Sequence, residues 1–338
     1  MRRDFSERQY TLDFEVDPSL RDLPLRADIF LARRMPFRSR HQLQKAFHRR
    51  EVLVDGRPAV PSHRLRGGER VQVLVEDRAQ HIPPGEVRFE VLHEDDEVLA
   101  INKPAGVMMH PAGGVLSGTL LNAVHHYFEA RGSPVRPVLL QRIDKDTSGL
   151  VLMAKNDTAH RFLYRHLARR AFDKIYLAVV PGRMETPDGS CAAPLLAVKG
   201  EGARQRMAAG ERPGAQAALT YYTTLAANSQ ASLLGVLLMT GRHHQIRAHM
   251  AHLGHPLIGD TLYGGGGDFP RQALHSYWLR FPHPLDQEPR ELTAPIPEDL
   301  QSLLGALRPA GSHARTWDSG CISRPWNPRT WIGTIRNP

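Results

Sequence analysis

The spacing of apolar residues along the chain predicts two folded parts joined by a polar linker. In the first part, apolar positions recur at helical and then at strand-like intervals. The expected elements are helices at 25–35 and 39–50, a hairpin at 52–60 and a strand at 71–75. Ser39 and Gln42 form a capping box at the start of the second helix, and Asp55-Gly56 is a typical hairpin turn. We therefore predict a small α/β domain over residues 24–75.

The segments around this domain lack a regular pattern. Residues 1–23 are polar and irregular, which predicts a loose N-terminal arm, and residues 76–87 contain Pro83-Pro84-Gly85, which predicts a linker. From residue 309 to 338 the periodicity ends among Ser, Gly, Pro and Arg, which indicates a disordered tail. The tail contains three tryptophans, Trp317, Trp326 and Trp331.

The second part, residues 88–308, is predicted to contain more strands than helices. Strands are expected at 89–92, 98–101, 149–154, 174–180 and 233–240, and helices at 120–130, 157–170 and 244–253. Residues 183–230 are rich in Ala, Gly and polar residues, which predicts weak strands and loops. Because strands and helices do not alternate regularly, we predict an α+β fold with a mixed, largely antiparallel sheet in place of a doubly wound one.

The composition narrows the class of protein. A net charge of +9 favours a polyanionic partner, nucleic acid before an anionic membrane, although a basic balance also serves solubility. There is no run of 18 apolar residues, and the basic N-terminus is not followed by an apolar stretch, so neither a membrane span nor a signal peptide is predicted. Cys191 and Cys321 lie far apart, which argues against a disulfide framework or a cysteine zinc site and fits a cytoplasmic protein.

Much of the positive charge gathers in the first part of the chain. The basic residues there are Arg33, Arg34, Arg38, Arg40, Lys45, Arg49, Arg50, Arg57, Arg64, Arg66 and Arg70. A charge run is usually a solvated surface, but a basic face on a compact domain also matches nucleic-acid phosphates and releases counterions on binding. We expect Arg40, Lys45 and Arg49 to contact RNA.

A turn at residues 141–150 contains the main candidate for chemistry. Asp144 precedes a tight turn and an apolar strand, so its carboxylate is expected to be held rigidly at the edge of a cleft. Arg142 and Lys145 should keep it ionised and available as a nucleophile or base. An ordinary turn aspartate explains the local sequence at least as well, and Asp146 is an equal candidate.

A third segment, Thr240 to His249, follows an apolar strand and opens a helix. The free backbone donors of a first helical turn suit an anion, and Arg242 adds a cation nearby. A metal site is suggested by the histidines of this region, His244, His249, His252 and His255. Because no acidic ligand lies between them and no Glu is placed as in zinc proteases, metal binding is not predicted.

Four stretches together resemble the RluA family of pseudouridine synthases over residues 88–305. They are Asn102-Lys103-Pro104-Ala105-Gly106 through His110-Pro111, Arg142 through Gly149, Lys174-Ile175-Tyr176, and Thr240 through Gly264. Residues 24–75 resemble the small RNA-binding domain named after ribosomal protein S-four, with signatures at 26–31, 39–45 and 52–56. The resemblance implies a pseudouridine synthase fold and an isomerase that acts on RNA.

The family pattern implies specific roles. Asp144, and not Asp146, matches the essential aspartate, while Tyr176 is implied to lie against the target base and Arg247 to pair with the aspartate, bidentately. Such an enzyme must break the bond between uracil and sugar, turn the base and rejoin it through carbon, on a base flipped out of its stack. The resemblance implies no cofactor and no metal. The residues expected to contact substrate are Arg142, Thr147, Arg242, His244 and Gln245.

The chain departs from the family pattern close to the expected site. Gln141 stands where His is usual, Ile143 where Leu is usual, and His243 where a small hydroxyl residue is usual. Relatives with the RNA-binding domain mostly act on large-subunit rRNA, so the resemblance implies a 23S rRNA target, and we expect a monomer.

Three other functions were weighed. A tRNA pseudouridine synthase is the nearest alternative. A non-catalytic RNA-binding or ribosome-assembly factor would be expected to lose Asp144, Tyr176 or Arg247, and all three are present. A hydrolase using Asp144 and Asp146 is disfavoured, because carboxylates two residues apart on a turn are poorly placed to flank one bond.

Overall fold

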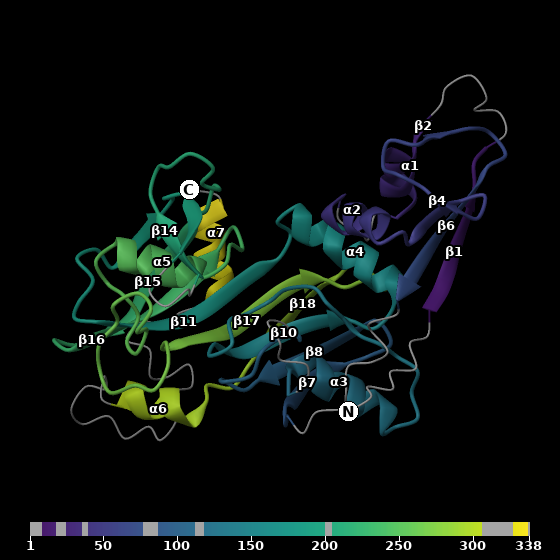
Figure 1. The fold of residues 1–338 in the computed structure, drawn as a ribbon. Helices are drawn as coiled ribbons and strands as arrows, with labels where there is room; N and C mark the ends of the chain where they lie inside the picture. The colour runs from purple at the N-terminus through teal and green to yellow at the C-terminus, as the bar shows by residue number, and fades with distance from the viewer. Residues whose placement is uncertain are drawn as a thin grey trace, which may run out of the picture. The chain divides into compact units, whose positions relative to one another are not determined.

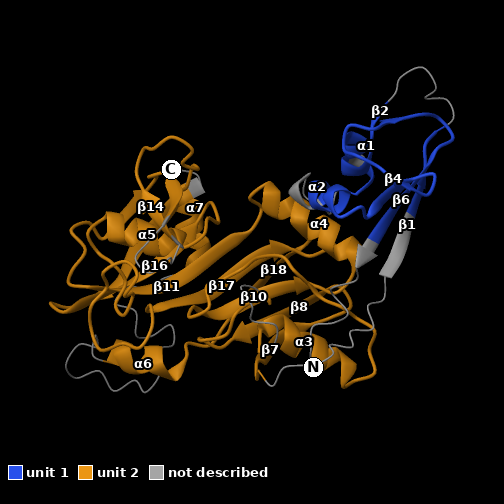
Figure 2. Cartoon of the chain, viewed as in Figure 1, with its two compact units in different colours: residues 1–81 blue, residues 82–338 orange. Residues whose placement is uncertain are grey.

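The chain folds into two compact units, residues 1–81 and residues 82–338, which are coloured separately in Figure 2. The computed structural model describes residues 9–17, 25–35, 40–76, 87–111, 118–199, 205–305 and 327–336. None of the helices within these ranges is long and apolar enough to cross a membrane.

Unit 1 packs two helices against a small antiparallel sheet. Its elements are β1 (Gln9–Glu15), β2 (Leu25–Arg26), α1 (Ala27–Arg34), α2 (Arg40–His48), β3 (Val52–Val54), β4 (Arg57–Pro58), β5 (Arg64–Leu65) and β6 (Arg70–Glu76). The four-stranded sheet has the order β1-β6-β3-β4. Phe30 and Leu31 of α1 share a buried core with Leu43 of α2 and Val71 of β6. The predicted capping residue Ser39 lies outside the described residues.

The prediction of a loose arm is wrong for Gln9–Glu15. This segment is β1, and its backbone pairs antiparallel with β6 along its whole length, from Gln9 opposite Glu76 to Glu15 opposite Arg70. The partner strand lies about sixty residues away in sequence, a separation over which local periodicity carries no information. Val16, just after the strand, is 1% exposed and belongs to the core of unit 1.

Unit 2 is built on a ten-stranded sheet (Figure 1). Eight of its strands follow the order β12-β15-β16-β11-β17-β10-β8-β7, while β18 pairs with β17 and β9 pairs with β10. Its strands are β7 (Glu90–Glu94), β8 (Val98–Lys103), β9 (Val138–Leu139), β10 (Ser148–Ala154), β11 (Asp173–Pro181), β12 (Asp188–Cys191), β15 (Thr220–Ala227), β16 (Ala231–Leu238), β17 (Leu274–Pro282) and β18 (Pro289–Thr293). A separate hairpin consists of β13 (Leu195–Lys199) and β14 (Gln205–Ala209). Its helices are α3 (Leu120–Glu129), α4 (Asp157–Ala168), α5 (Gln245–His252), α6 (Glu298–Gly305) and α7 (Pro328–Arg336).

Among the described strands of this sheet, only β10 and β17 pair in parallel, so the predicted mixed, largely antiparallel sheet is confirmed. Both faces of the sheet are covered. Val151 and Met153 of β10 pack in the core that includes α3 and α5, while Leu150 and Leu152 pack in the core that includes α4. This period-two division buries every residue of β10 and makes it a rigid support for the turn that precedes it.

The sequence pattern missed the strand that joins the two halves of this sheet. β17 lies between β11 and β10, yet the segment Leu274–Pro282 was assigned no element. It is buried on both faces, so polar and apolar residues do not alternate along it. In the 183–230 region, β15 is likewise a long and mostly buried strand, where weak strands and loops were predicted.

The prediction of a disordered tail is wrong for Pro328–Arg336. This segment forms α7, and Ile332 is 4% exposed because it packs against Ile175, Leu237 and Trp278 of the sheet. Trp331 is partly buried against the same cluster. A helix this short is stabilised mainly by packing its apolar face against another apolar surface. The sheet provides that surface, but the periodicity of the sequence does not show that it is there. Trp317 and Trp326 lie outside the described residues.

Gly149 allows the parallel pair β10–β17 to approach closely beside the turn at Asp144. Its φ is +107°, and an added Cβ would lie 2.2 Å from the carbonyl oxygen of Ser276. Gly132 has a comparable positive φ of +67°, but no atom lies within 4 Å of an added Cβ. Substitutions at these two positions therefore distinguish the energetic cost of a positive φ from the cost of a steric clash.

Gly149→Ala should cost about 4 kcal/mol of unfolding free energy, because strain and a clash with backbone coincide. Gly132→Ala should cost only about 1 kcal/mol, because strain acts alone. Urea denaturation of both variants measures the difference. Equal losses in the two variants would show that the close approach at Gly149 is not a constraint.

Candidate active site

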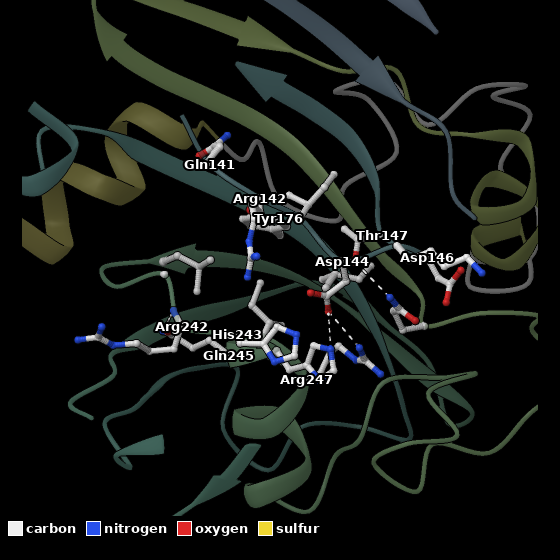
Figure 3. A pocket seen from close by; sticks show the side chains of 18 of the residues that line it. Gln141, Arg142, Asp144, Asp146, Thr147, Tyr176, Arg242, His243, Gln245 and Arg247 are labelled. Atoms are coloured by element: carbon white, nitrogen blue, oxygen red, sulfur yellow. Dashed lines mark hydrogen bonds and ion pairs between the residues drawn. The ribbon is translucent and has the colours of Figure 1, made fainter. Parts of the chain in front are cut away.

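A cleft of about 1080 Å³ opens in unit 2 where several segments of the chain meet. It is lined by the turn that precedes β10, by β11, by the loop into α5, and by the loops around residues 259–262 and 269–274. Figure 3 shows that Asp144, Tyr176 and Arg247, which are far apart in sequence, lie together in this cleft.

A buried guanidinium connects two carboxylates at the floor of the cleft. Arg247 donates from Nη1 to Asp144 Oδ2 at 3.0 Å, and from Nε and Nη2 to the two oxygens of Asp260 at 2.6 and 2.8 Å. The predicted pairing of Arg247 with Asp144 therefore occurs, but the bidentate partner is Asp260. The Asp260 side chain is fully buried, whereas that of Asp144 is 19% exposed and faces the cleft. Hydrogen bonds and attraction from both carboxylates raise the pKa of Arg247 despite its burial.

The backbone of the Asp144 turn is held by two further buried basic side chains. Lys103, fully buried, donates from Nζ to the carbonyl oxygens of Pro104, Val107 and Lys145, each at 2.8 Å. Burial lowers the pKa of Lys103 to about 7, against the opposing attraction of Asp146 and Asp144. Arg271 donates to the carbonyl oxygen of Asp146 at 3.1 Å and forms an ion pair with Asp299. The turn is thus fixed through its main chain, which leaves the Asp144 side chain directed at the cleft.

Asp144 and Asp146 differ in what they face. The Asp146 carboxylate points away from Arg247 in Figure 3, whereas Asp144 points toward it. Because Asp144 and Asp146 are two residues apart on a turn, their carboxylates point to different sides. They therefore do not face each other across a substrate bond. Of the two, Asp144 is the one that accepts a hydrogen bond from Arg247.

Tyr176 extends from β11 into the lining of the cleft. Its side chain is buried, with a residue exposure of 6%, and burial raises the pKa of its hydroxyl to about 12 even though a hydrogen bond with Ser276 opposes that shift. The hydroxyl therefore keeps its proton at neutral pH, and the ring supplies an aromatic surface to whatever enters the cleft.

His244 lies close to Asp144 at the start of α5. It adopts a left-handed backbone conformation, with φ of 51°, and its Nε2 atom is 3.6 Å from Asp144 Oδ2. Burial lowers its pKa to about 4, although Asp144 opposes this, so the imidazole is neutral at pH 7. The ring of His243 stacks on it with centroids 3.8 Å apart. Burial lowers the pKa of His243 as well.

The other predicted contact residues of unit 2 divide into two groups. Arg142 and Arg242 are exposed and line the cleft, as contacts to an anionic substrate require. Thr147 is 1% exposed, and its hydroxyl accepts from Gln272 at 3.3 Å. Gln245 is 2% exposed, and its amide bonds Thr240, Arg242, Leu219 and Thr220. Both residues line the cleft, but these polar groups already have hydrogen-bond partners within the protein.

The predicted RNA contacts of unit 1 lie on or just after α2. Lys45 and Arg49 are exposed, and Arg49 has Glu51 at 3.6 Å. The side chain of Arg40 lies outside what the structure describes. Among the histidines considered as metal ligands, His249 is buried and uses both ring nitrogens, with Thr220 at 2.8 Å and the carbonyl of Ala193 at 2.9 Å. Cys191 is free and buried, and Cys321 lies outside the described residues.

Sequence reasoning missed three charged residues of the site. Asp260 and Lys103 lie in the stretches that carry the family resemblance, but the motifs by themselves assign no function to either residue. Arg271 carried no signal, because its partners Asp146 and Asp299 belong to distant segments.

Comparison with known proteins defines the class. Residues 97–252 match the family model described as RNA pseudouridylate synthase. The chain is 39% identical to ribosomal large subunit pseudouridine synthase D of Xanthomonas campestris, over 86% of this chain and 91% of that protein. It is 37% identical to an uncharacterized RNA pseudouridine synthase of Bacillus subtilis, over 85% and 95%. The structure of human RNA pseudouridylate synthase domain containing 1 shares the fold, with a TM-score of 0.57, 24% identity, and coverage of 75% of this chain and 96% of that one.

The chain therefore belongs to the RNA pseudouridylate synthases, and is an isomerase that converts uridine in RNA to pseudouridine. Within that class it is a member of the RluA family, as the sequence motifs implied.

Asp260→Asn should lower the unfolding free energy by about 3 kcal/mol, because it leaves the buried Arg247 charge without its bidentate partner. A matched control is Asp286→Asn, since Asp286 and Arg290 form an ion pair with both side chains more than a third exposed. That variant should change stability by less than about 1 kcal/mol. Urea denaturation measures both, and similar losses would contradict a structural role for the Arg247–Asp260 pair.

Proposed function

We propose that this enzyme isomerises uridines in large-subunit ribosomal RNA and that Asp144 is its catalytic carboxylate. The observation that carries the assignment is the shared guanidinium. Arg247 gives two hydrogen bonds to Asp260 and one to Asp144, so the Asp144 carboxylate is oriented but not enclosed. A carboxylate held this way within an open cleft can act as a nucleophile or base on the sugar or the base of a bound uridine.

The cleft has the features that a flipped uridine needs. Its volume of about 1080 Å³ accommodates a nucleoside, and the exposed Arg142 and Arg242 supply cations for the flanking phosphates. Tyr176 supplies a ring on which a detached uracil can stack while it turns, so that its carbon and not its nitrogen meets the sugar. His244, being neutral, is suited to accept or donate a hydrogen bond without competing for Asp144 as a cation.

Unit 1 is proposed to bind the RNA. Its described surface carries many exposed arginines and lysines, namely Arg34, Lys45, Arg49, Arg50, Arg57, Arg64, Arg66 and Arg70. Such a surface neutralises phosphates and makes binding salt-dependent. The large-subunit target is supported by the similarity to ribosomal large subunit pseudouridine synthase D of Xanthomonas campestris and by the resemblance of residues 24–75 to an RNA-binding domain. We further propose a cytoplasmic, monomeric enzyme.

The target is tested by mapping pseudouridines in rRNA and tRNA from cells with and without this protein. At least one 23S rRNA site should be lost on deletion and restored by the wild-type gene. Loss confined to tRNA, or no loss at all, would overturn the proposed target.

Asp144→Asn should abolish restoration of the modified site and lower isomerase activity by roughly 10⁴-fold or more, the scale expected when a catalytic group is removed. RNA affinity should persist, because the RNA-contacting surface is unchanged. The matched control is Asp146→Asn, whose carboxylate points away from Arg247 and which should stay within roughly tenfold of wild type. Activity is measured by tritium release from RNA labelled at uracil C5, and affinity by fluorescence anisotropy. An active Asp144→Asn enzyme would contradict the assignment.

Substitutions of Tyr176 can distinguish the contribution of its aromatic ring to activity from that of its hydroxyl group. Its protonated, buried hydroxyl is a poor base at neutral pH, so the ring is expected to matter more. Tyr176→Phe should keep activity within roughly tenfold, whereas Tyr176→Leu should lose about 10- to 100-fold, the value of one stacked base. If instead the Phe variant loses about 10² to 10⁴-fold, the scale of a proton-transfer group, the hydroxyl acts in catalysis.

A further inference from the structure

Two adjacent histidines stand beside the Asp144 carboxylate in the cleft. The rings of His243 and His244 are stacked, with planes 25° apart. Each of the three side chains offers one ligand atom, and these atoms all lie within 4.8 Å of one another. Two imidazole nitrogens and a carboxylate oxygen form the donor set that Zn²⁺ takes in sites that keep an open coordination position.

The spacing of the donors fits such an ion. Ligand atoms about 2.1 Å from a tetrahedral zinc ion lie about 3.4 Å apart. His244 Nε2 and Asp144 Oδ2 are 3.6 Å apart, which is too long for a hydrogen bond but close to that spacing. The other ring nitrogen of His244 lies 3.2 Å from the Tyr263 hydroxyl, a contact of the kind that orients metal-binding imidazoles. We propose that Asp144, His243 and His244 bind a zinc-type divalent cation.

The charge of the surroundings permits a cation there. Arg247 touches Asp144 and would repel an incoming ion, but the fully buried carboxylate of Asp260 takes two of its hydrogen bonds and offsets its charge. Asp144 Oδ2 accepts one hydrogen bond, from Arg247 at 3.0 Å, and keeps a second lone pair for the ion. The cleft is open, so the ion can enter and keep water in its remaining positions.

A second histidine–carboxylate cluster in the described chain fits a cation less well. His93 and His283 both place Nε2 within hydrogen-bond distance of Asp95 Oδ2, at 2.8 and 2.9 Å. A metal would have to displace both N–H hydrogen bonds. It would also meet the ammonium of Lys155, which donates to the Asp95 carbonyl. This cluster therefore serves as an internal control.

The third ligand is a feature of this chain. His243 stands where the RluA pattern described above usually has a small hydroxyl residue, which would leave His244 as the one imidazole of this set. An ion held by Asp144 would occupy the catalytic carboxylate, so it inhibits the isomerase and is not a resident cofactor. The inhibition rests on the proposed role of Asp144, whereas the binding does not.

Binding is tested by titrating ZnCl₂ into the untagged, chelator-treated full chain in a calorimeter. The wild type should bind zinc at neutral pH, and His243→Ser, which restores the usual residue type, should bind it at least tenfold more weakly. His93→Gln should bind like the wild type. Absence of zinc binding, or binding that His243→Ser leaves unchanged, would overturn the proposal, and loss of binding in His93→Gln would place the ion at the other cluster.

Inhibition is tested in the tritium-release assay. Zinc should inhibit the wild type, the same concentration of Mg²⁺ should not because that ion prefers oxygen ligands, and His243→Ser should need at least tenfold more zinc. Equal zinc sensitivity of wild type and His243→Ser would overturn the site. Zinc binding lost in His243→Ser, but without inhibition of the wild type, would leave the site standing and overturn the catalytic role of Asp144.

Discussion

The buried guanidinium of Arg247 is the interaction on which the site depends. It takes its bidentate partner from Asp260 and reaches Asp144 with the remaining nitrogen, so helix α5, the loop after it and the turn before β10 meet at one charged group. A buried cation is tolerated only when its charge is balanced and its donors are satisfied. Asp260 provides that balance, and Asp144 therefore keeps an oxygen directed at the cleft.

The same principle governs the backbone around Asp144. Lys103 and Arg271 donate to main-chain carbonyls of the turn, Lys103 at Lys145 and Arg271 at Asp146. These hydrogen bonds hold the main chain of the turn and leave the side chain of Asp144 free of them. The strand that follows the turn, β10, is buried along its whole length and cannot shift without disturbing two cores. A rigid sheet thus supports a turn whose Asp144 carboxylate is already oriented by Arg247 before substrate arrives.

The surroundings of that acid set what it can bind. Neutral imidazoles at His243 and His244 do not compete with Arg247 for the carboxylate, and for the same reason they present lone pairs to a metal ion. An open, oriented carboxylate beside neutral histidines is suited to a uridine, and is also vulnerable to a zinc-type cation. Both properties follow from imidazoles that carry no charge of their own beside the carboxylate.

The sequence by itself determined the class of fold, most long elements and the candidacy of Asp144, because periodicity and motif order are local properties of the chain. It did not distinguish Asp144 from Asp146 on local grounds; the family pattern did so, and the geometry agrees. Only the tertiary structure decided that Asp260 is the bidentate partner of Arg247 and that the polar groups of Thr147 and Gln245 form hydrogen bonds within the protein. It also revealed the elements β1, β17 and α7. Each of these depends on partners distant in sequence, and a hydrogen bond or an apolar contact is defined only once both partners are placed in space.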